Sequence, residues 1–83
     1  MNQEELTDKE ELDLLLDAKK NLAWLEEHFG EVLRAHNNEY VAIKGGELIG
    51  SSKTLDSLLD ELKKSGADLR KTVVEYITEI RIL

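Results

Sequence analysis

The sequence predicts a small α+β domain with a long N-terminal helix, a β-hairpin, a second helix and a third strand, in the order α-β-β-α-β. Three observations predict this order. A helical apolar period runs from residue 14 to residue 36, two β-rich runs flank Gly45-Gly46, and a leucine repeat followed by a β-branched run comes after residue 54. We expect a three-stranded mixed sheet with both helices on one of its faces.

The first helix is predicted to begin at Asp8, because Thr7 and Glu10 have the spacing of a capping box. Its apolar positions keep one phase at 100° per residue, which favours one continuous helix that ends near Asn37-Asn38. A break at Lys19–Asn21 is the alternative. The apolar stripe contains Leu14, Leu15, Ala18, Leu22, Leu25, Phe29, Val32, Leu33 and His36.

The hairpin is predicted from Gly45-Gly46, because a two-residue turn of type I′ needs positive φ at both central residues. Counting outward from this turn pairs the strand residues in order. This register places Val41, Ile43 and Leu48 on the buried face. The predicted pairs are Lys44 with Glu47, Ile43 with Leu48, Ala42 with Ile49 and Val41 with Gly50.

The second helix is predicted to follow Thr54 as its N-cap and to end at Gly66 as a left-handed cap. Residues 68–71 form a connector, with room for one helical turn. A last strand follows from Thr72 to about Thr78, with a possible continuation to Ile82. We expect the strand order 2-1-3, with the third strand parallel in direction to the second and the other sheet face open.

Charge is concentrated at the N-terminus. Residues 1–17 hold seven acids against Lys9 alone, whereas residues 18–83 hold eleven acids and ten bases, for a net charge of −7. The sequence has no clustered Lys/Arg, which argues against nucleic-acid or membrane binding, and no cysteine, which excludes thiolate chemistry. It has no long apolar segment and an acidic start, so we expect a cytoplasmic protein. We expect a disordered acidic tail over residues 1–7 and one domain over 8–83, in which 8–20 is a helical extension.

Four motifs follow one another along the chain: Asn21-Leu22-Ala23-Trp24-Leu25, Tyr40-Val41-Ala42-Ile43-Lys44 with a glycine turn, the leucine-rich segment from Thr54 to Gly66, and Val74-Glu75-Tyr76-Ile77. Together they resemble a family of small prokaryotic domains of unknown function. The resemblance covers about residues 21–78. It implies the fold and a protein partner, and it carries no catalytic, cofactor or metal residues.

A loop between the hairpin and the second helix has some features of a phosphate-binding loop. However, Glu47 and Ser52 stand where that motif requires glycine. The amides at the helix start remain a candidate anion site, and a small-ligand or anion-binding regulator is the alternative function. The candidate anion residues are Ser51, Ser52, Lys53 and Thr54.

Catalysis has weak support in the sequence, and we expect a non-enzymatic protein without cofactor or metal. His28 and His36 lie about 12 Å apart on a continuous helix, too far to share a metal ion. An enzyme would need a pocket built across a dimer from His28 and Glu31.

A mismatch in size predicts an interface. A helix from residue 8 to 36 would be about 43 Å long, whereas strands of five to seven residues span about 16 to 23 Å. The apolar positions continue into the overhanging part, so a monomer would expose them. We expect residues 8–30 to pair with another helix, most simply in a homodimer; the alternative is a helical hairpin folded onto its own domain. The predicted interface residues are Leu12, Leu14, Leu15, Leu16, Ala18, Ala23 and Gly30.

Overall fold

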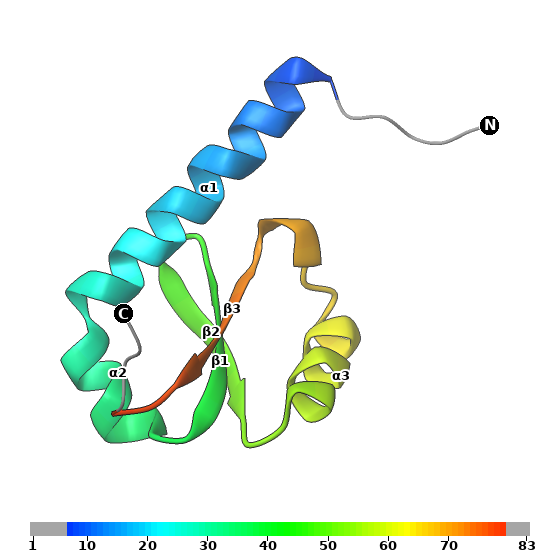
Figure 1. Ribbon diagram of the computed structural model, residues 1–83. Helices are drawn as coiled ribbons and strands as arrows, with labels where there is room; N and C mark the ends of the chain where they lie inside the picture. The colour runs from blue at the N-terminus through cyan, green and yellow to red at the C-terminus, as the bar shows by residue number, and fades with distance from the viewer. Residues whose placement is uncertain (1–6, 80–83) are drawn as a thin grey trace.

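Strand β1 (Glu39–Lys44) is the centre of a three-stranded sheet with the order β2-β1-β3 (Figure 1). In this computed structural model, which describes residues 7–79, β2 (Glu47–Ser52) and β3 (Val73–Ile77) both pair with β1 in antiparallel orientation. The predicted strand order is confirmed, and β2 and β3 run in the same direction as predicted. The sheet is nevertheless antiparallel rather than mixed, because β1 separates the two strands that share a direction.

The helices cover opposite faces of the sheet. Helices α1 (Asp8–Glu27) and α2 (Phe29–His36) pack on one face, and α3 (Leu55–Ser65) packs on the other (Figure 1). The prediction of both helices on one face, with the other face open, is therefore wrong. Three successive residues of β1 are completely buried, and alternating side chains point to opposite faces, so each face of the central strand needs a cover. Those residues are Val41, Ala42 and Ile43.

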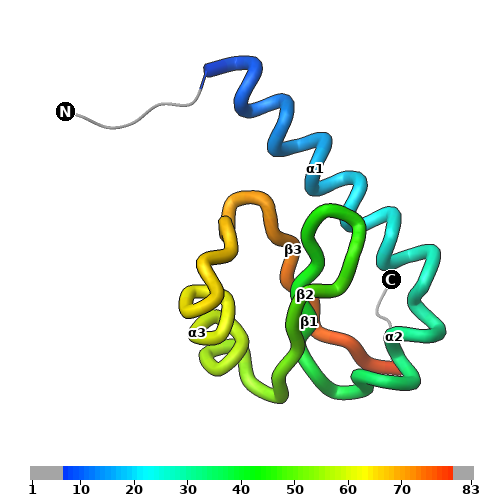
Figure 2. Tube along the Cα trace, turned by 180° about the vertical axis from the view of Figure 1, so that it is seen from behind, coloured from blue at the N-terminus to red at the C-terminus, as the bar shows by residue number. Residues whose placement is uncertain are grey.

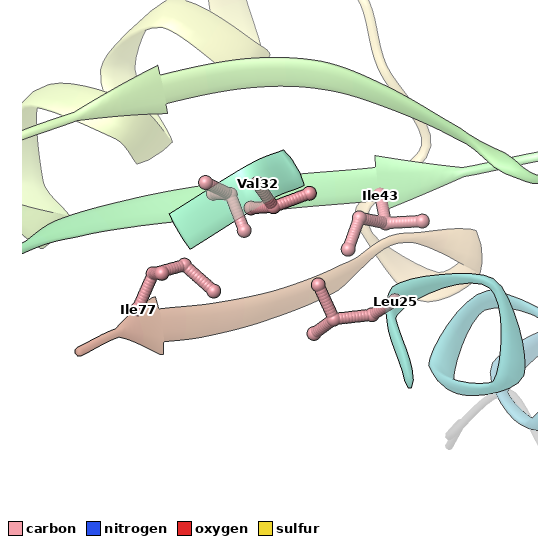
Figure 3. Close-up of a cluster of buried hydrophobic side chains, with 5 residues drawn as sticks. Leu25, Val32, Ile43 and Ile77 are labelled. Atoms are coloured by element: carbon pink, nitrogen blue, oxygen red, sulfur yellow. The ribbon is translucent and has the colours of Figure 1, made fainter. Parts of the chain in front are cut away.

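The core under α1 and α2 is the one that the hairpin pattern predicted. Side chains from both helices meet β1 and β3 there, and Figure 3 shows four of them pointing toward one another. Leu48 of β2 packs against the same cluster, which confirms the predicted buried face. The buried members are Leu25, Val32, Val41, Ile43 and Ile77.

A β-bulge in β2 fits the second face of the sheet to α3. The pairs next to the turn are as predicted, but the register then shifts and Ala42 pairs with Gly50 instead of Ile49. Gly50 now faces α3, where a Cβ atom would lie 3.2 Å from Cδ1 of Leu58. The bulge thus places the residue without a side chain where the helix comes closest. Ala42, Leu58 and Leu62 form the buried cluster on this side.

The N-terminal helical segment is broken at His28. This residue has φ −107° and ψ 15°, outside the helical range, although its N–H still donates to the carbonyl of Trp24. The predictions of a continuous helix and of a break at Lys19–Asn21 are both wrong. The His28 ring is stacked on Trp24 with 4.5 Å between the ring centroids, and its Nδ1 lies 2.9 Å from the Trp24 carbonyl oxygen. These contacts hold the bend in place.

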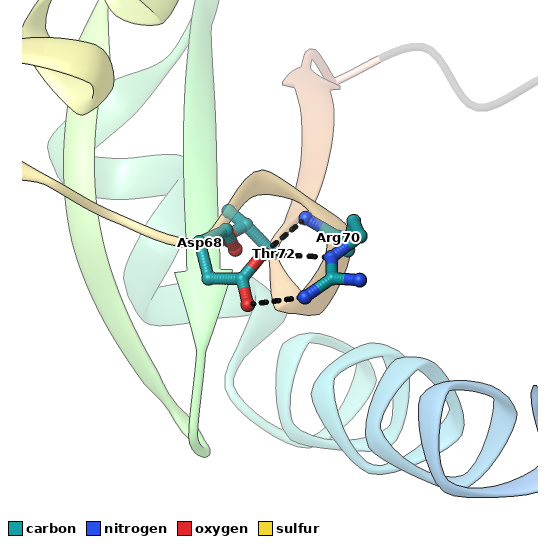
Figure 4. A network of polar contacts seen from close by, with 3 residues as sticks. All are labelled: Asp68, Arg70 and Thr72. Carbon is teal, nitrogen blue, oxygen red and sulfur yellow. Dashed lines mark hydrogen bonds and ion pairs between the residues drawn. The ribbon is translucent and has the colours of Figure 1, made fainter. Parts of the chain in front are cut away.

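The caps of α3 and the connector after it are confirmed. The Thr54 hydroxyl accepts from the N–H of Ser57, and Gly66 ends the helix with φ 79°. A 3₁₀ helix, η1 (Leu69–Lys71), forms the predicted turn, and Asp68 organises it (Figure 4). The Asp68 carboxylate accepts from the backbone and guanidinium of Arg70, and its carbonyl accepts from the Thr72 hydroxyl.

The predicted ends of the chain are only partly covered by the structure. Strand β3 begins at Val73 and ends at Ile77, one residue inside each predicted limit. Most of the predicted tail (residues 1–6) and the end of the possible continuation to Ile82 lie outside the described residues.

Candidate functional site

Helix α1 begins at the predicted capping box. The Thr7 hydroxyl accepts from the N–H of Glu10 at 3.1 Å, and the Glu10 carboxylate accepts from the N–H of Thr7 at 2.9 Å. The hydrogen bond from the Thr7 N–H is the main reason that the pKa of Glu10 lies below its usual value, and the Arg70 charge adds to the shift. The helix therefore has a defined start at Asp8.

Only the second half of α1 packs on the sheet. Asn21 and Leu25 are its buried residues. The first half projects past the hairpin turn, as both views show (Figures 1 and 2), and its inner side faces η1. The helix has 20 residues and is about 30 Å long, at 1.5 Å per residue. The predicted overhang is present.

Asn21 fixes the rotation of α1 about its own axis. Its side chain is 1% exposed, and its Oδ1 accepts from the N–H of Gly46 at 3.0 Å. Its Nδ2 donates to the carbonyl of Lys71 at 3.3 Å. One polar side chain thus joins the helix to the hairpin turn and to η1, and the same face of α1 must point inward.

The opposite face of α1 carries exposed leucines. Leu12 lies nine residues before Asn21 and Leu16 nine before Leu25, which is about two and a half helical turns, so each points away from its buried counterpart. We call Leu12, Leu15, Leu16, Leu22 and Ala23 the outer ridge. Its leucines are 54%, 68%, 49% and 41% exposed, in that order, and Ala23 is also exposed.

The structure separates the residues that the sequence placed in one interface. Leu12, Leu15, Leu16 and Ala23 lie together on the outer ridge. Leu14 and Ala18 are half-buried on the inner side of α1, and Gly30 is an exposed residue of α2, beyond the break. Leu22, which belongs to the predicted buried stripe, is instead exposed beside Ala23.

A cleft of mixed charge lies between the inner side of α1 and η1. Its volume is about 170 Å³, and carboxylates of α1 line one wall while basic residues of η1 line the other. This pairing could not be predicted from the sequence, because the residues are some 60 positions apart and only the docking of α1 brings them together. The lining residues are Glu10, Asp13, Leu14, Arg70 and Lys71.

The candidate anion residues do not converge on one point. Ser51 and Ser52 belong to β2, where they pair with Val41 and Tyr40. Lys53 is exposed, and the Thr54 hydroxyl is engaged by the N–H of Ser57. One amide of the helix start is therefore already bound by the protein itself.

Both histidines contact neighbouring residues. His28 is held against Trp24, Glu31 is exposed one turn further on, and His36 Nδ1 lies 2.9 Å from Oε1 of Glu39. Between residues 7 and 79 no group of three His, Cys, Asp or Glu side chains has the spacing to hold a metal ion. None of the helices in this same range is long and apolar enough to cross a membrane.

Comparison with known proteins and families gives one match, and it lies in the second part of the chain. No curated protein and no solved structure matches it. The family match covers residues 31–79, which run from α2 through the sheet and α3 to the end of β3, and does not include α1. The protein therefore belongs to the family of unknown function DUF5678.

Proposed function

We propose that the protein is a non-enzymatic protein–protein interaction module that associates with a second copy of itself through the outer ridge of α1. One observation carries this proposal. Four leucines lie exposed on the face of α1 that points away from the described part of its own domain, residues 29–79. Contiguous apolar surface of this kind is typical of interaction sites, whereas scattered exposed leucines are ordinary.

The spacing of the ridge is that of a helix–helix contact. Leu12, Leu15 and Leu22 stand at heptad positions a, d and d, and Lys19 occupies the a position between them. A polar residue at one a position lowers stability and helps to select the register and the number of strands. The ridge is about three turns long, so it supports a modest and reversible association.

The domain cannot cover the ridge by rotating α1. Burying Leu15 would turn Asn21 away from Gly46 and Lys71, and would break both hydrogen bonds of a buried amide. Each hydrogen bond that this rotation breaks contributes about 0.5 to 1.5 kcal/mol to stability. A partner from outside the chain covers the ridge without this cost.

The contacts of the residues that could act in catalysis support the proposal of a non-enzymatic protein. The His28 ring is occupied by its stacking on Trp24 and its contact with the Trp24 carbonyl. Glu31 is an exposed residue in the first turn of α2, and Glu39 lies against His36. Both positions suit a structural role. The match to a family of unknown function is compatible with this reading.

The proposal is tested by size-exclusion chromatography with light scattering on two matched double variants. Leu15→Gln with Leu16→Gln removes the centre of the ridge. Leu55→Gln with Leu69→Gln changes two leucines that are each 40% exposed elsewhere on the surface. We expect the first pair to yield a monomer and the second to keep the dimer mass. Equal masses for both pairs would contradict the proposal.

A further inference from the structure

We propose that the charge of Lys19 sets both the strength and the partner preference of the outer ridge. A second copy brings its own Lys19 to the same place and therefore associates weakly, whereas a ridge with a carboxylate at this position associates more tightly. The role of Lys19 rests on the proposed function, and it holds whichever way the two α1 helices run.

Lys19 lies at the centre of the outer ridge. Residues three or four apart are neighbours on the surface of a helix, and the four positions at these distances from Lys19 all belong to the ridge. They are Leu15, Leu16, Leu22 and Ala23. Leu12, the fifth member, lies about two turns before Lys19. Lys19 is itself exposed, so its side chain lies on the apolar surface that a partner must cover.

The ammonium group of Lys19 has no carboxylate beside it. None of its four neighbours on the helix is acidic, and no ion pair within residues 7–79 includes Lys19. The nearest acidic residues along α1 are on its inner side, because Asp17 is half-buried and Asp13 lines the cleft beside η1. The positive charge within the ridge is therefore not balanced by a neighbour in the described part of the chain.

A second copy brings two Lys19 side chains close together in either orientation. In a parallel pair about a two-fold axis, each Lys19 is level with the other. In an antiparallel pair whose ridges cover each other from Leu12 to Ala23, Lys19 lies opposite Leu16, so the two lysines are about 4.5 Å apart along the axis. Packed helix axes are about 8 to 10 Å apart. The two charges thus lie within about the Debye length of 10 Å at 0.1 M salt, where screening is incomplete.

The lysine weakens the pair without preventing it. Its long stem can stay on the apolar surface while the ammonium group extends toward water. Like charges across an interface still oppose association, whereas a lysine and a carboxylate across an interface favour it. The ridge therefore selects a helix that has a neutral or acidic residue opposite Lys19.

Removal of the charge tests the effect on strength. Sedimentation equilibrium compares the dissociation constants of the unmodified full chain, Lys19→Met and Lys63→Met. Methionine keeps an unbranched apolar stem without the charge, and Lys63 is an exposed residue of α3, away from the ridge. We expect Lys19→Met to associate at least about tenfold more tightly than the unmodified chain, because the like charges are gone. Lys63→Met should leave the dissociation constant unchanged.

Reversal of the charge tests the partner preference. Lys19→Glu replaces two facing lysines by two facing carboxylates, so this variant alone should associate as weakly as the unmodified chain. An equimolar mixture of Lys19→Glu with the unmodified chain, labelled with nitrogen-15 to separate the masses, is measured by native mass spectrometry. We expect mixed dimers to exceed the half that random mixing gives, because each then pairs a lysine with a carboxylate.

The outcomes separate the role of Lys19 from the proposed function. Tighter association of Lys19→Met together with an excess of mixed dimers supports the role of Lys19. A dissociation constant that Lys19→Met leaves unchanged, or random mixing with Lys19→Glu, overturns that role and leaves the self-association intact. A monomer mass at every concentration for both the unmodified chain and Lys19→Met overturns the proposed function itself.

Discussion

The side-chain oxygen of Asn21 accepts a hydrogen bond from the backbone N–H of Gly46, 25 residues later in the chain. Asn21 is the one buried polar side chain among the described residues, and it joins α1 to the turn of the hairpin. This contact decides which face of α1 points inward, and so which leucines are left outside.

Replacing Asn21 by leucine should lower the free energy of unfolding by about 1 to 3 kcal/mol, because it leaves the Gly46 N–H and the Lys71 carbonyl without their partner. Urea unfolding followed by Trp24 fluorescence measures the change. Asn37→Ala, at an exposed asparagine after α2, is the matched control and should change stability by less than about 0.5 kcal/mol. Equal effects of the two variants would show that the Asn21 contacts do not position α1.

Gly50→Val should destabilise the domain by about 1 to 3 kcal/mol through overpacking against α3. A Cβ atom at this position already lies 3.2 Å from Leu58 and 3.8 Å from Leu62. The neighbouring change Ile49→Val, on an exposed side chain of the same strand, should have little effect. Thermal unfolding by circular dichroism compares them, and a Gly50→Val chain as stable as Ile49→Val would refute the close approach of α3.

The same substitution at two other glycines should have opposite signs. Gly66→Ala should destabilise by about 1 kcal/mol, because alanine is strained at φ 79°. Gly30→Ala should stabilise by up to about 1 kcal/mol, because Gly30 is an exposed helical residue whose added Cβ meets only the end of the Arg34 side chain, at 4.0 Å. Chemical denaturation of both variants gives the signs, and two changes of the same sign would contradict the assignment.

The start of α1 should loosen in acid. The carboxylate of Glu10 accepts from the Thr7 N–H, and its pKa is lowered from the ordinary value of 4.5. The stabilisation is complete above pH 4.5, and it is lost as the pH falls through the lowered pKa of the folded state. Backbone chemical shifts of residues 8–12 report the loss between pH 6 and 2.

Glu10→Gln is the control for that titration. Glutamine still accepts the hydrogen bond from Thr7 but does not titrate, so the part of the acid response that depends on Glu10 should disappear. An acid response that is unchanged in Glu10→Gln would assign the effect to other carboxylates.

The parts of the fold that the sequence predicted correctly depend on local rules. The capping box at Thr7, the turn at Gly45-Gly46, the N-cap at Thr54 and the left-handed end at Gly66 each follow from a residue and its near neighbours. The strand order followed from the apolar character of β1. These features need no knowledge of the rest of the molecule.

Two of the predictions that were wrong concern contacts between distant segments, and a third concerns a contact between side chains one helical turn apart. The bulge places Gly50 under Leu58 of α3, and no count outward from the turn includes that helix. The side of the sheet that α3 covers was misjudged because Ala42 looks weakly apolar and the predicted register paired Gly50 with Val41. The small size of Ala42 and Gly50 is what lets α3 approach. The break at His28 depends on the ring contact with Trp24, which the spacing of apolar residues does not encode.

The candidate interface was predictable only in part. The overhang of α1 followed from its length, and Leu12, Leu15 and Leu16 lie on its outer ridge. The inward placement of Leu14 and Ala18 follows from the rotation of the helix, which Asn21 sets through partners 25 and 50 residues away. The one sequence signal was the polar residue Asn21 at the edge of the apolar stripe, one turn before Leu25.

Sedimentation equilibrium of the unmodified full chain tests the central claim most directly. We predict a reversible equilibrium between the 9.5 kDa chain and a species of twice that mass, with the dimer favoured as the concentration rises. A single species with the mass of one chain at every concentration would contradict the account, because the outer ridge would then remain exposed to water without a partner.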